Sequence, residues 1–110
     1  MTLKNITRKT ILTTDLKVIK TFKNRALGLL DPKNSRSLLI KTHFGIHTFL
    51  LRDKIDVVVL SDNFHVTNLK CVSPNRLYIY NPKNSSVVEL PAGSIKKSKT
   101  QIGDKLKMLE

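Results

Sequence analysis

The chain has 110 residues, with 20 Lys and Arg residues against eight Asp and Glu residues and a formal net charge of +12. This length suits one domain and is too short for two substantial hydrophobic cores. Apolar residues make up 40% of the chain, which favours a globular protein over a disordered one. No apolar run is long enough to span a membrane, and the N-terminus lacks the apolar stretch of a signal peptide. We therefore expect a single domain over residues 1–110, located in the cytoplasm.

The first third of the chain changes its hydrophobic period. Residues 10–13 and 16–19 are short β-prone runs, which predict two strands. From Thr21 the apolar residues recur at the spacing of one helix face, and Pro32 would end that helix. This pattern predicts one short helix near residues 21–30.

After Pro32 the apolar runs have the length of strands. Turn residues such as Asn, Asp, Pro and Gly separate most of them. The predicted strands cover residues 38–40, 46–51, 55–60, 65–72, 77–80, 87–90 and 105–109. Many short strands with frequent turns are typical of a sandwich or barrel. We expect a mostly β (β-rich α+β) fold, a small barrel-like antiparallel or mixed sheet with that one helix, and a basic loop at about residues 94–104.

Several polar residues interrupt the apolar runs. An ionised carboxylate in such a setting is costly unless it is paired and hydrogen-bonded. Alternation places Asp56 on the face of Val58 and Leu60, and Glu89 on the face of Val87. The chain therefore needs donors close to these carboxylates. The candidate donors are Arg25, His47, Arg52 and Arg76.

Arg25 lies on the predicted helix, and its planar guanidinium suits a carboxylate. We expect it to reach Asp56 or Glu89 and to tie the helix to the sheet. Two interpretations stay open: a purely structural ion pair, or a polar pocket that binds a ligand. In the pocket, His47 and Thr48 would present hydrogen-bonding groups, and Gly93 would let the backbone approach. The candidate ligand-pocket residues are Arg25, His47, Thr48, Asp56, Glu89 and Gly93.

The order of these segments resembles the uncharacterised family called domain of unknown function 192, in the branch with a His-Thr-Phe motif. The similarity extends over about residues 16–109. The segments that carry it are Arg25–Leu30, Ile46–Arg52, Ile55–Leu60, Pro74–Arg76, Val88–Gly93 and Gly103–Asp104. The resemblance implies a compact, mostly β domain with a barrel-like sheet and a short helix. It implies no reaction.

The chain departs from the family pattern at three places. The family usually has methionine at the position of Leu51 and a Phe-Pro pair at Asp53-Lys54. A cysteine common near the start of the second motif corresponds to His43. These departures argue against any role that needs a thiol at that place.

Enzyme chemistry has little support in the sequence. A strand would separate His43 and His47 by about 13 Å, too far to share one metal ion. Cys71, the only cysteine, excludes an intrachain disulfide and is expected to be a small buried hydrophobe. There is no nucleophile elbow or phosphate-binding glycine loop. We expect no catalytic residue, no metal and no cofactor.

The basic charge and two tyrosines suggest an alternative. Tyr78 and Tyr80 stand two residues apart in a predicted strand, as stacking platforms for bases do. Lys70 and Arg76 precede them in the sequence. The sequence therefore favours a non-catalytic binding or accessory module for a small ligand or a protein. The alternatives are a basic nucleic-acid-binding domain and, more weakly, a small hydrolase-like enzyme that uses the polar pocket residues.

Overall fold

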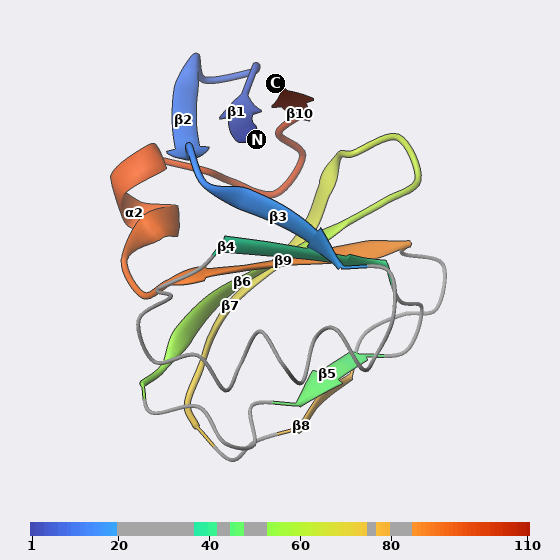
Figure 1. The fold of residues 1–110 in the computed structure, drawn as a ribbon, viewed down its shortest axis with the longest axis vertical. Coiled ribbons are helices and arrows are strands. Elements are labelled where there is room, and N and C mark those ends of the chain that lie inside the picture. The colour runs from blue at the N-terminus through green and yellow to red at the C-terminus, as the bar shows by residue number, and fades with distance from the viewer. Residues whose placement is uncertain (20–36, 42–44, 48–52, 75–76, 80–84) are drawn as a thin grey trace.

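The computed structural model describes residues 1–19, 37–41, 45–47, 53–74, 77–79 and 85–110 (Figure 1). The described elements are β1 (Thr2–Asn5), β2 (Thr10–Thr13), β3 (Leu16–Ile19), β4 (Ser37–Lys41), β5 (Gly45–His47), β6 (Ile55–Leu60), β7 (Val66–Val72), β8 (Leu77–Ile79), β9 (Ser86–Pro91), α2 (Ser94–Ser98) and β10 (Leu106–Leu109). The predicted strands are confirmed wherever the structure describes them. The helix predicted near residues 21–30 lies outside the described residues.

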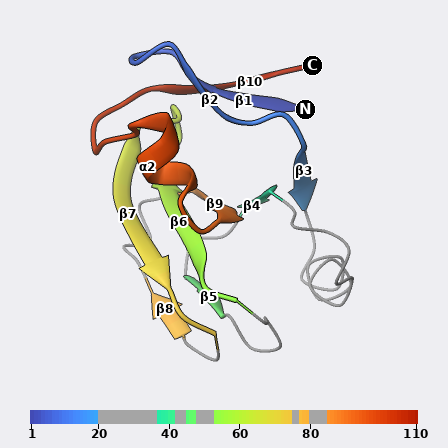
Figure 2. The same cartoon turned by 90° about the vertical axis from the view of Figure 1, so that its left-hand side faces the viewer.

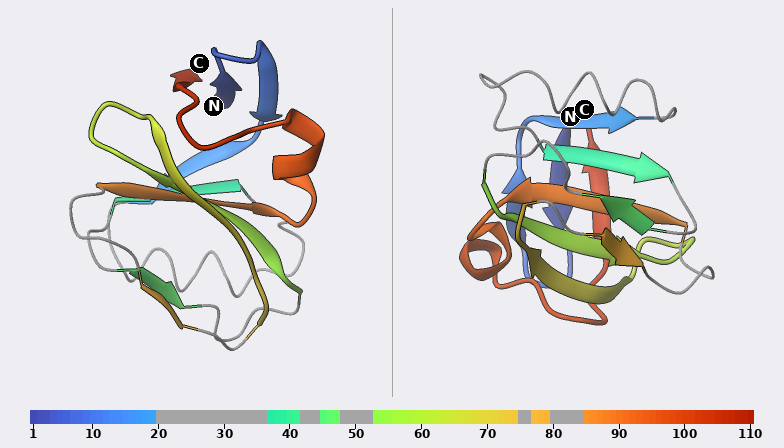
Figure 3. Two further views of the ribbon diagram at one scale, coloured as in Figure 1. Left: turned by 180° about the vertical axis from the view of Figure 1, so that it is seen from behind. Right: turned by 90° about the horizontal axis from the view of Figure 1, so that it is seen from below.

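The strands form three layers (Figures 1 and 3). The middle layer is a mixed five-stranded sheet in the order β3-β4-β9-β6-β7, with β3 and β4 parallel and the other pairs antiparallel. A three-stranded sheet, β10-β1-β2, lies on one side of it, and the pair β5-β8 lies on the other. The termini lie side by side because β1 and β10 are antiparallel partners.

The central sheet separates two apolar clusters. Strands β6 and β9 are Val-rich and buried along nearly their whole length, as expected of strands covered on both faces. One cluster lies towards the three-stranded sheet and is called the upper cluster. It contains Leu3, Leu12, Leu16, Leu39, Val58, Leu60, Val66, Val88, Leu90 and Leu106. The other, the lower cluster, contains Leu38, Ile40, Val57, Val59, Val72 and Val87.

The predicted mostly β fold is confirmed, but the barrel-like closure is not. The order of each described sheet begins and ends with a different strand, so each sheet is open within the described ranges. Strand β7 pairs only with β6 among these strands, and β3 pairs only with β4. Closing a sheet into a barrel requires the edge strands to pair, whereas here the apolar faces are covered by stacking separate sheets.

Helix α2 occupies the start of the basic segment that the sequence predicts as a loop. Gly93 precedes the helix with φ +97°, and Lys99 ends it in the left-handed region at φ +59°. The helix packs against the start of β2, where the Thr10 hydroxyl donates to the Ser98 carbonyl over 2.7 Å. No helix within the described residues is long and apolar enough to cross a membrane.

A buried carboxylate joins both ends of the chain beside α2. Asp104 is 3% exposed, and its Oδ2 accepts three hydrogen bonds. Asn5 Nδ2 donates at 2.9 Å, the Gln101 backbone N–H at 2.9 Å and Arg8 Nε at 3.1 Å. Asn5 also donates to Thr100 Oγ1, and Arg8 donates to Gln101 Oε1. These residues, called the Asp104 cluster, fasten the first hairpin to the segment before β10.

The donors determine the charge state of Asp104. Burial by itself would raise the pKa of this carboxyl group, but the hydrogen bonds from Asn5, Gln101 and Arg8, together with the Arg8 charge, lower it below the usual 3.8. A folded-state pKa below the unfolded-state value stabilises the fold at any pH above the unfolded-state pKa. This contribution is lost as the pH falls through the folded-state pKa.

We expect the substitution Asp104→Asn to lower the free energy of unfolding at neutral pH by about 1–3 kcal/mol, since the charge-assisted bonds become neutral ones. Urea unfolding at a series of pH values measures this. The difference between the wild type and Asp104→Asn should begin to shrink below about pH 4, where the carboxyl group of the unfolded chain takes up its proton. It should shrink further until the pH has fallen through the lower folded-state pKa.

The exposed Asp62 supplies the matched control. Asp62→Asn should change stability by less than about 0.5 kcal/mol. A pH-independent difference between Asp104→Asn and the wild type would contradict the role given to the Asp104 charge.

Candidate functional site

Asp56, one of the predicted pocket residues, binds the start of α2. Its side chain is 5% exposed and extends from β6 towards the helix. Its Oδ2 accepts the backbone N–H of Gly93 at 3.0 Å and that of Ile95 at 2.9 Å. The first N–H groups of a helix have no partner within the helix, and Gly93 has no side chain to cap them. Asp56 therefore caps α2 from a strand that lies far away in the sequence.

Gly93 is required for its backbone conformation. At φ +97° a side chain is strained, whereas a Cβ built at this position would meet nothing within 4 Å. The open space means that the glycine is not explained by a close approach of another group. Its left-handed conformation turns the chain out of β9 and directs its N–H to Asp56. Asp56 and Gly93 thus come together in a contact that positions a helix, a role that the sequence analysis did not assign to them.

Glu89 lies on the opposite face of the central sheet. It is 2% exposed, and it pairs with Leu38 on one side and Val57 on the other. Cross-strand partners share a face, so Glu89 lies among the residues of the lower cluster. Lys70 pairs with Val57 on β7, and Lys17 pairs with Leu38 on β3.

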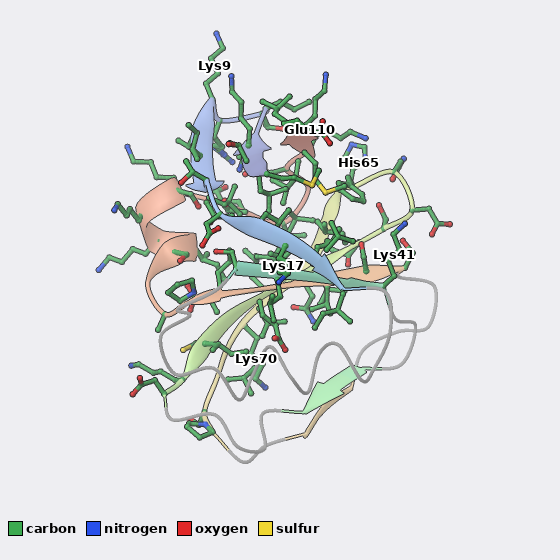
Figure 4. The ribbon with its side chains drawn as sticks, in the orientation of Figure 1. Lys9, Lys17, Lys41, His65, Lys70 and Glu110 are labelled. Atoms are coloured by element: carbon green, nitrogen blue, oxygen red, sulfur yellow. The ribbon has the colours of Figure 1, made fainter. Side chains whose placement is uncertain are left out.

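One row of cross-strand partners therefore runs across the sheet. It consists of Lys17, Leu38, Glu89, Val57 and Lys70. We call it the Glu89 row. Both lysines are exposed, and Figure 4 labels them at β3 and β7. Each is two strands from Glu89, about 10 Å between Cα atoms. Glu89 itself is engaged in a polar or electrostatic interaction within the protein.

Asp56 and Glu89 consequently occupy separate places. Asp56 shares its face with Leu90 and the upper cluster, and Glu89 shares the other face with Val57. A twisted sheet lies between the two carboxylates. Alternation assigns each carboxylate to a face of its own strand, and the register between β6 and β9 shows that these two faces are opposite. The two residues cannot contribute to one pocket on a single face.

The other candidate residues are distributed as follows. His47 ends β5, Tyr78 lies in β8, and these two strands pair antiparallel with Ile46 opposite Tyr78. This pair lies on the Glu89 side of the central sheet (Figure 1). Arg25, Thr48, Arg76 and Tyr80 lie outside the described residues.

Cys71 is one residue whose environment the sequence analysis predicted wrongly. The expectation was a buried small hydrophobe, but Cys71 is exposed on the edge strand β7, opposite Asp56. Strand β7 has one partner strand, β6, among the described elements, and at its start Val66 exchanges backbone hydrogen bonds with Gly103 and Asp104. Within the described ranges, no group of three His, Cys, Asp or Glu side chains is arranged to hold a metal ion.

The Asp104 cluster is the polar assembly that sequence reasoning missed. Asn5 and Asp104 are 99 residues apart in the chain, and no short-range spacing links them. The Gly103–Asp104 pair was noted for its resemblance only. Its left-handed Gly103, at φ +95°, sits directly before the carboxylate.

These features define a class of small β-rich domains in which an open mixed sheet is enclosed between two smaller sheets. The chain belongs to the family DUF192, described as "Uncharacterized ACR, COG1430", whose model matches residues 3–108. An uncharacterised UPF0127 protein from Pyrococcus horikoshii is 30% identical over 99 residues, which cover 84% of this chain and 86% of the relative. A UPF0127 protein from Thermococcus sibiricus is 29% identical over 109 residues, covering 93% of this chain and 71% of the relative.

Two solved structures share the fold. A protein of unknown function from Novosphingobium aromaticivorans superimposes with a TM-score of 0.76 at 14% identity, covering 97% of this chain and 82% of the other. A proposed transcription regulator from Sinorhizobium meliloti gives a TM-score of 0.74 at 17% identity, covering 96% and 89%. At these identities the likeness concerns the arrangement of strands.

We expect Asp56→Ala to lower the free energy of unfolding by about 1–3 kcal/mol, because two backbone N–H groups lose their acceptor beside the upper cluster. Chemical denaturation followed by circular dichroism measures the change. The exposed Asp53 lies three residues away on the same segment, and Asp53→Ala should cost less than about 0.5 kcal/mol. Equal effects of the two substitutions would contradict the capping role.

Proposed function

We propose that the protein is a non-catalytic module that binds a small polar ligand on the Glu89 side of its central sheet. The observation that carries the proposal is the position of Glu89, 2% exposed in the middle of an apolar sheet face. Removing a carboxylate from water is costly, and apolar side chains of similar volume at this place would avoid that cost. A function for the charge explains why an otherwise Val- and Leu-rich face contains it.

The surroundings of Glu89 match the chemistry of small-molecule sites. Such sites are lined mainly by apolar side chains, with a few polar groups that orient the ligand. Leu38, Val57 and Val87 supply the apolar part, and Glu89 supplies a hydrogen-bond acceptor. The ligand class that fits is a small molecule with an apolar body and a donor group such as an amine, amide or hydroxyl. His47 and Tyr78 would complete such a site, since their strands β5 and β8 form the pair on this side of the central sheet.

The arrangement of the carboxylates favours binding over hydrolysis. General acid–base catalysis by two carboxylates requires both groups to face one substrate. Asp56 faces away from Glu89, and two backbone N–H groups already occupy its Oδ2. This pair therefore offers no acid–base machinery for the hydrolase alternative.

The test is a thermal-shift screen of the wild type and Glu89→Gln against small amines, amino acids and sugars. Compounds that raise the melting temperature of the wild type should have no effect on Glu89→Gln, because the variant keeps the shape and loses the charge. Glu110→Gln makes the same chemical change at an exposed position and should respond as the wild type does. His47→Ala should also abolish the shifts.

Three results would decide against this function. Equal ligand-induced shifts in Glu89→Gln and the wild type, or no shift with any compound, would leave Glu89 as a purely structural residue. Salt-sensitive binding to bulk RNA or DNA that is lost in Tyr78→Ala would favour the nucleic-acid alternative, with Tyr78, Tyr80, Lys70 and Arg76 as its residues.

A further inference from the structure

The exposed large apolar side chains of the described residues all belong to one end of the molecule. They are Met1, Ile6, Ile11, Ile102 and Leu109, with exposed fractions from 37% to 65%. Each lies on a strand of the three-stranded sheet or in a segment next to one. Single exposed apolar residues are ordinary, but their concentration at one sheet indicates an interaction surface.

The register of the three-stranded sheet defines this surface. Leu3 and Asn5 are 0% exposed and face the core, so their neighbours in β1 point away from it. The residues on the other side, called the outer face, are Thr2, Lys4, Ile11, Lys107 and Leu109. In Figure 2 the sheet lies above α2 and β7, and no other described segment covers it from outside.

Lysines accompany the apolar residues on the outer face. Lys4 lies between Ile11 and Lys107 in one row of cross-strand partners. Lys9 stands near the same sheet, in the turn between β1 and β2 (Figure 4). Lys105 directly precedes β10, and its ammonium donates to the Asn63 carbonyl. Asp104 turns its charge inward to Arg8, and the exposed Glu110 follows Leu109 beyond the end of β10 (Figure 4). The outer face is therefore both basic and apolar.

We propose that the outer face is a docking surface for an anionic lipid bilayer. A bilayer supplies both partners at once: negative headgroups for the lysines, and acyl chains for Ile11 and Leu109. Lysine stems are long enough to keep their charge at the headgroups while neighbouring apolar side chains go deeper. Nucleic acid would use the lysines and leave the aliphatic residues without a role, since bases stack on aromatic or Arg side chains. A second copy is disfavoured because each chain has a net charge of +12.

The experiment is sedimentation with vesicles of phosphatidylcholine alone or of an equimolar mixture with phosphatidylglycerol. The wild type should bind the anionic vesicles and not the neutral ones. The double variant Lys4→Glu, Lys107→Glu should bind them at least about tenfold more weakly. The matched control Lys41→Glu, Lys54→Glu makes the same change in net charge away from the outer face and should lose at most about threefold. Figure 4 labels Lys41 at the end of β4.

A second substitution tests the apolar part. Ile11 is 54% exposed, so Ile11→Ser should fold, which circular dichroism and the melting temperature check. It should weaken binding to anionic vesicles by about three- to tenfold, and most clearly at raised salt, where the lysines are screened. Leu109→Ser should act in the same direction.

Three outcomes would overturn the proposal. The first is that the wild type does not bind anionic vesicles at low salt. The second is that the two double variants lose the same affinity, which would reduce the effect to net charge. The third is that a single-stranded RNA oligonucleotide binds through Lys4 and Lys107 while Ile11→Ser leaves vesicle binding unchanged. That result would assign the outer face to nucleic acid.

Discussion

The arrangement of the three-stranded sheet and α2 depends on the hydrogen bonds that the Asp104 carboxylate accepts. Its three donors come from β1, from the turn after β1 and from the segment that leads into β10. The contact between Asn5 and Asp104 closes almost the whole chain into one loop. Closing so long a loop has an entropic cost, which favourable contacts must offset. A buried carboxylate can join the chain ends in this way only when all of its hydrogen-bond donors are in place, because burying an unpaired charge is costly. These hydrogen bonds thereby fix the positions of the chain ends, α2 and the outer face relative to one another.

Much of the strand content could be predicted because burial leaves a direct trace in the sequence. Strands β6 and β9 are covered on both faces, so they read as continuous apolar runs. Strand β1 leaves no such trace: it has four residues, and Asn5 is one of its two fully buried side chains. Helix α2 was missed for a similar reason, since five residues contain too little of a helical period and its cap lies on another strand. The open sheets were missed because stacking separate sheets and closing one sheet bury the same apolar positions.

For the candidate site, too, the sequence predicts what depends on neighbouring residues and not what depends on contacts between distant segments. Alternation along each strand correctly places Asp56 and Glu89 on the faces where the structure has them. Alternation does not predict which groups of other segments contact the two carboxylates. The donors that bind Asp56 are backbone N–H groups, which every residue except proline carries, so nothing in the side-chain pattern marks them. The expected contact of Arg25 with Asp56 or Glu89 stays a prediction, because Arg25 lies outside the described residues. Asp104 was overlooked because two of its three donors are uncharged amide groups.

The burial of acidic side chains connects the Asp104 cluster and the cap of α2 with the proposed ligand site and the proposed docking surface. Of the seven acidic residues that the structure describes, three are buried: Asp56, Glu89 and Asp104. Asp56 caps α2, Asp104 joins the chain ends, and Glu89 also has an interaction partner within the protein. Glu89 differs because it stands in the middle of an apolar face rather than at a helix end or a turn. Burying acids also removes negative charge from the surface, so the remaining exterior is more basic than the composition alone indicates. The same folding pattern thus buries Glu89 below the central sheet and leaves Lys4 and Lys107 on the outer face above it.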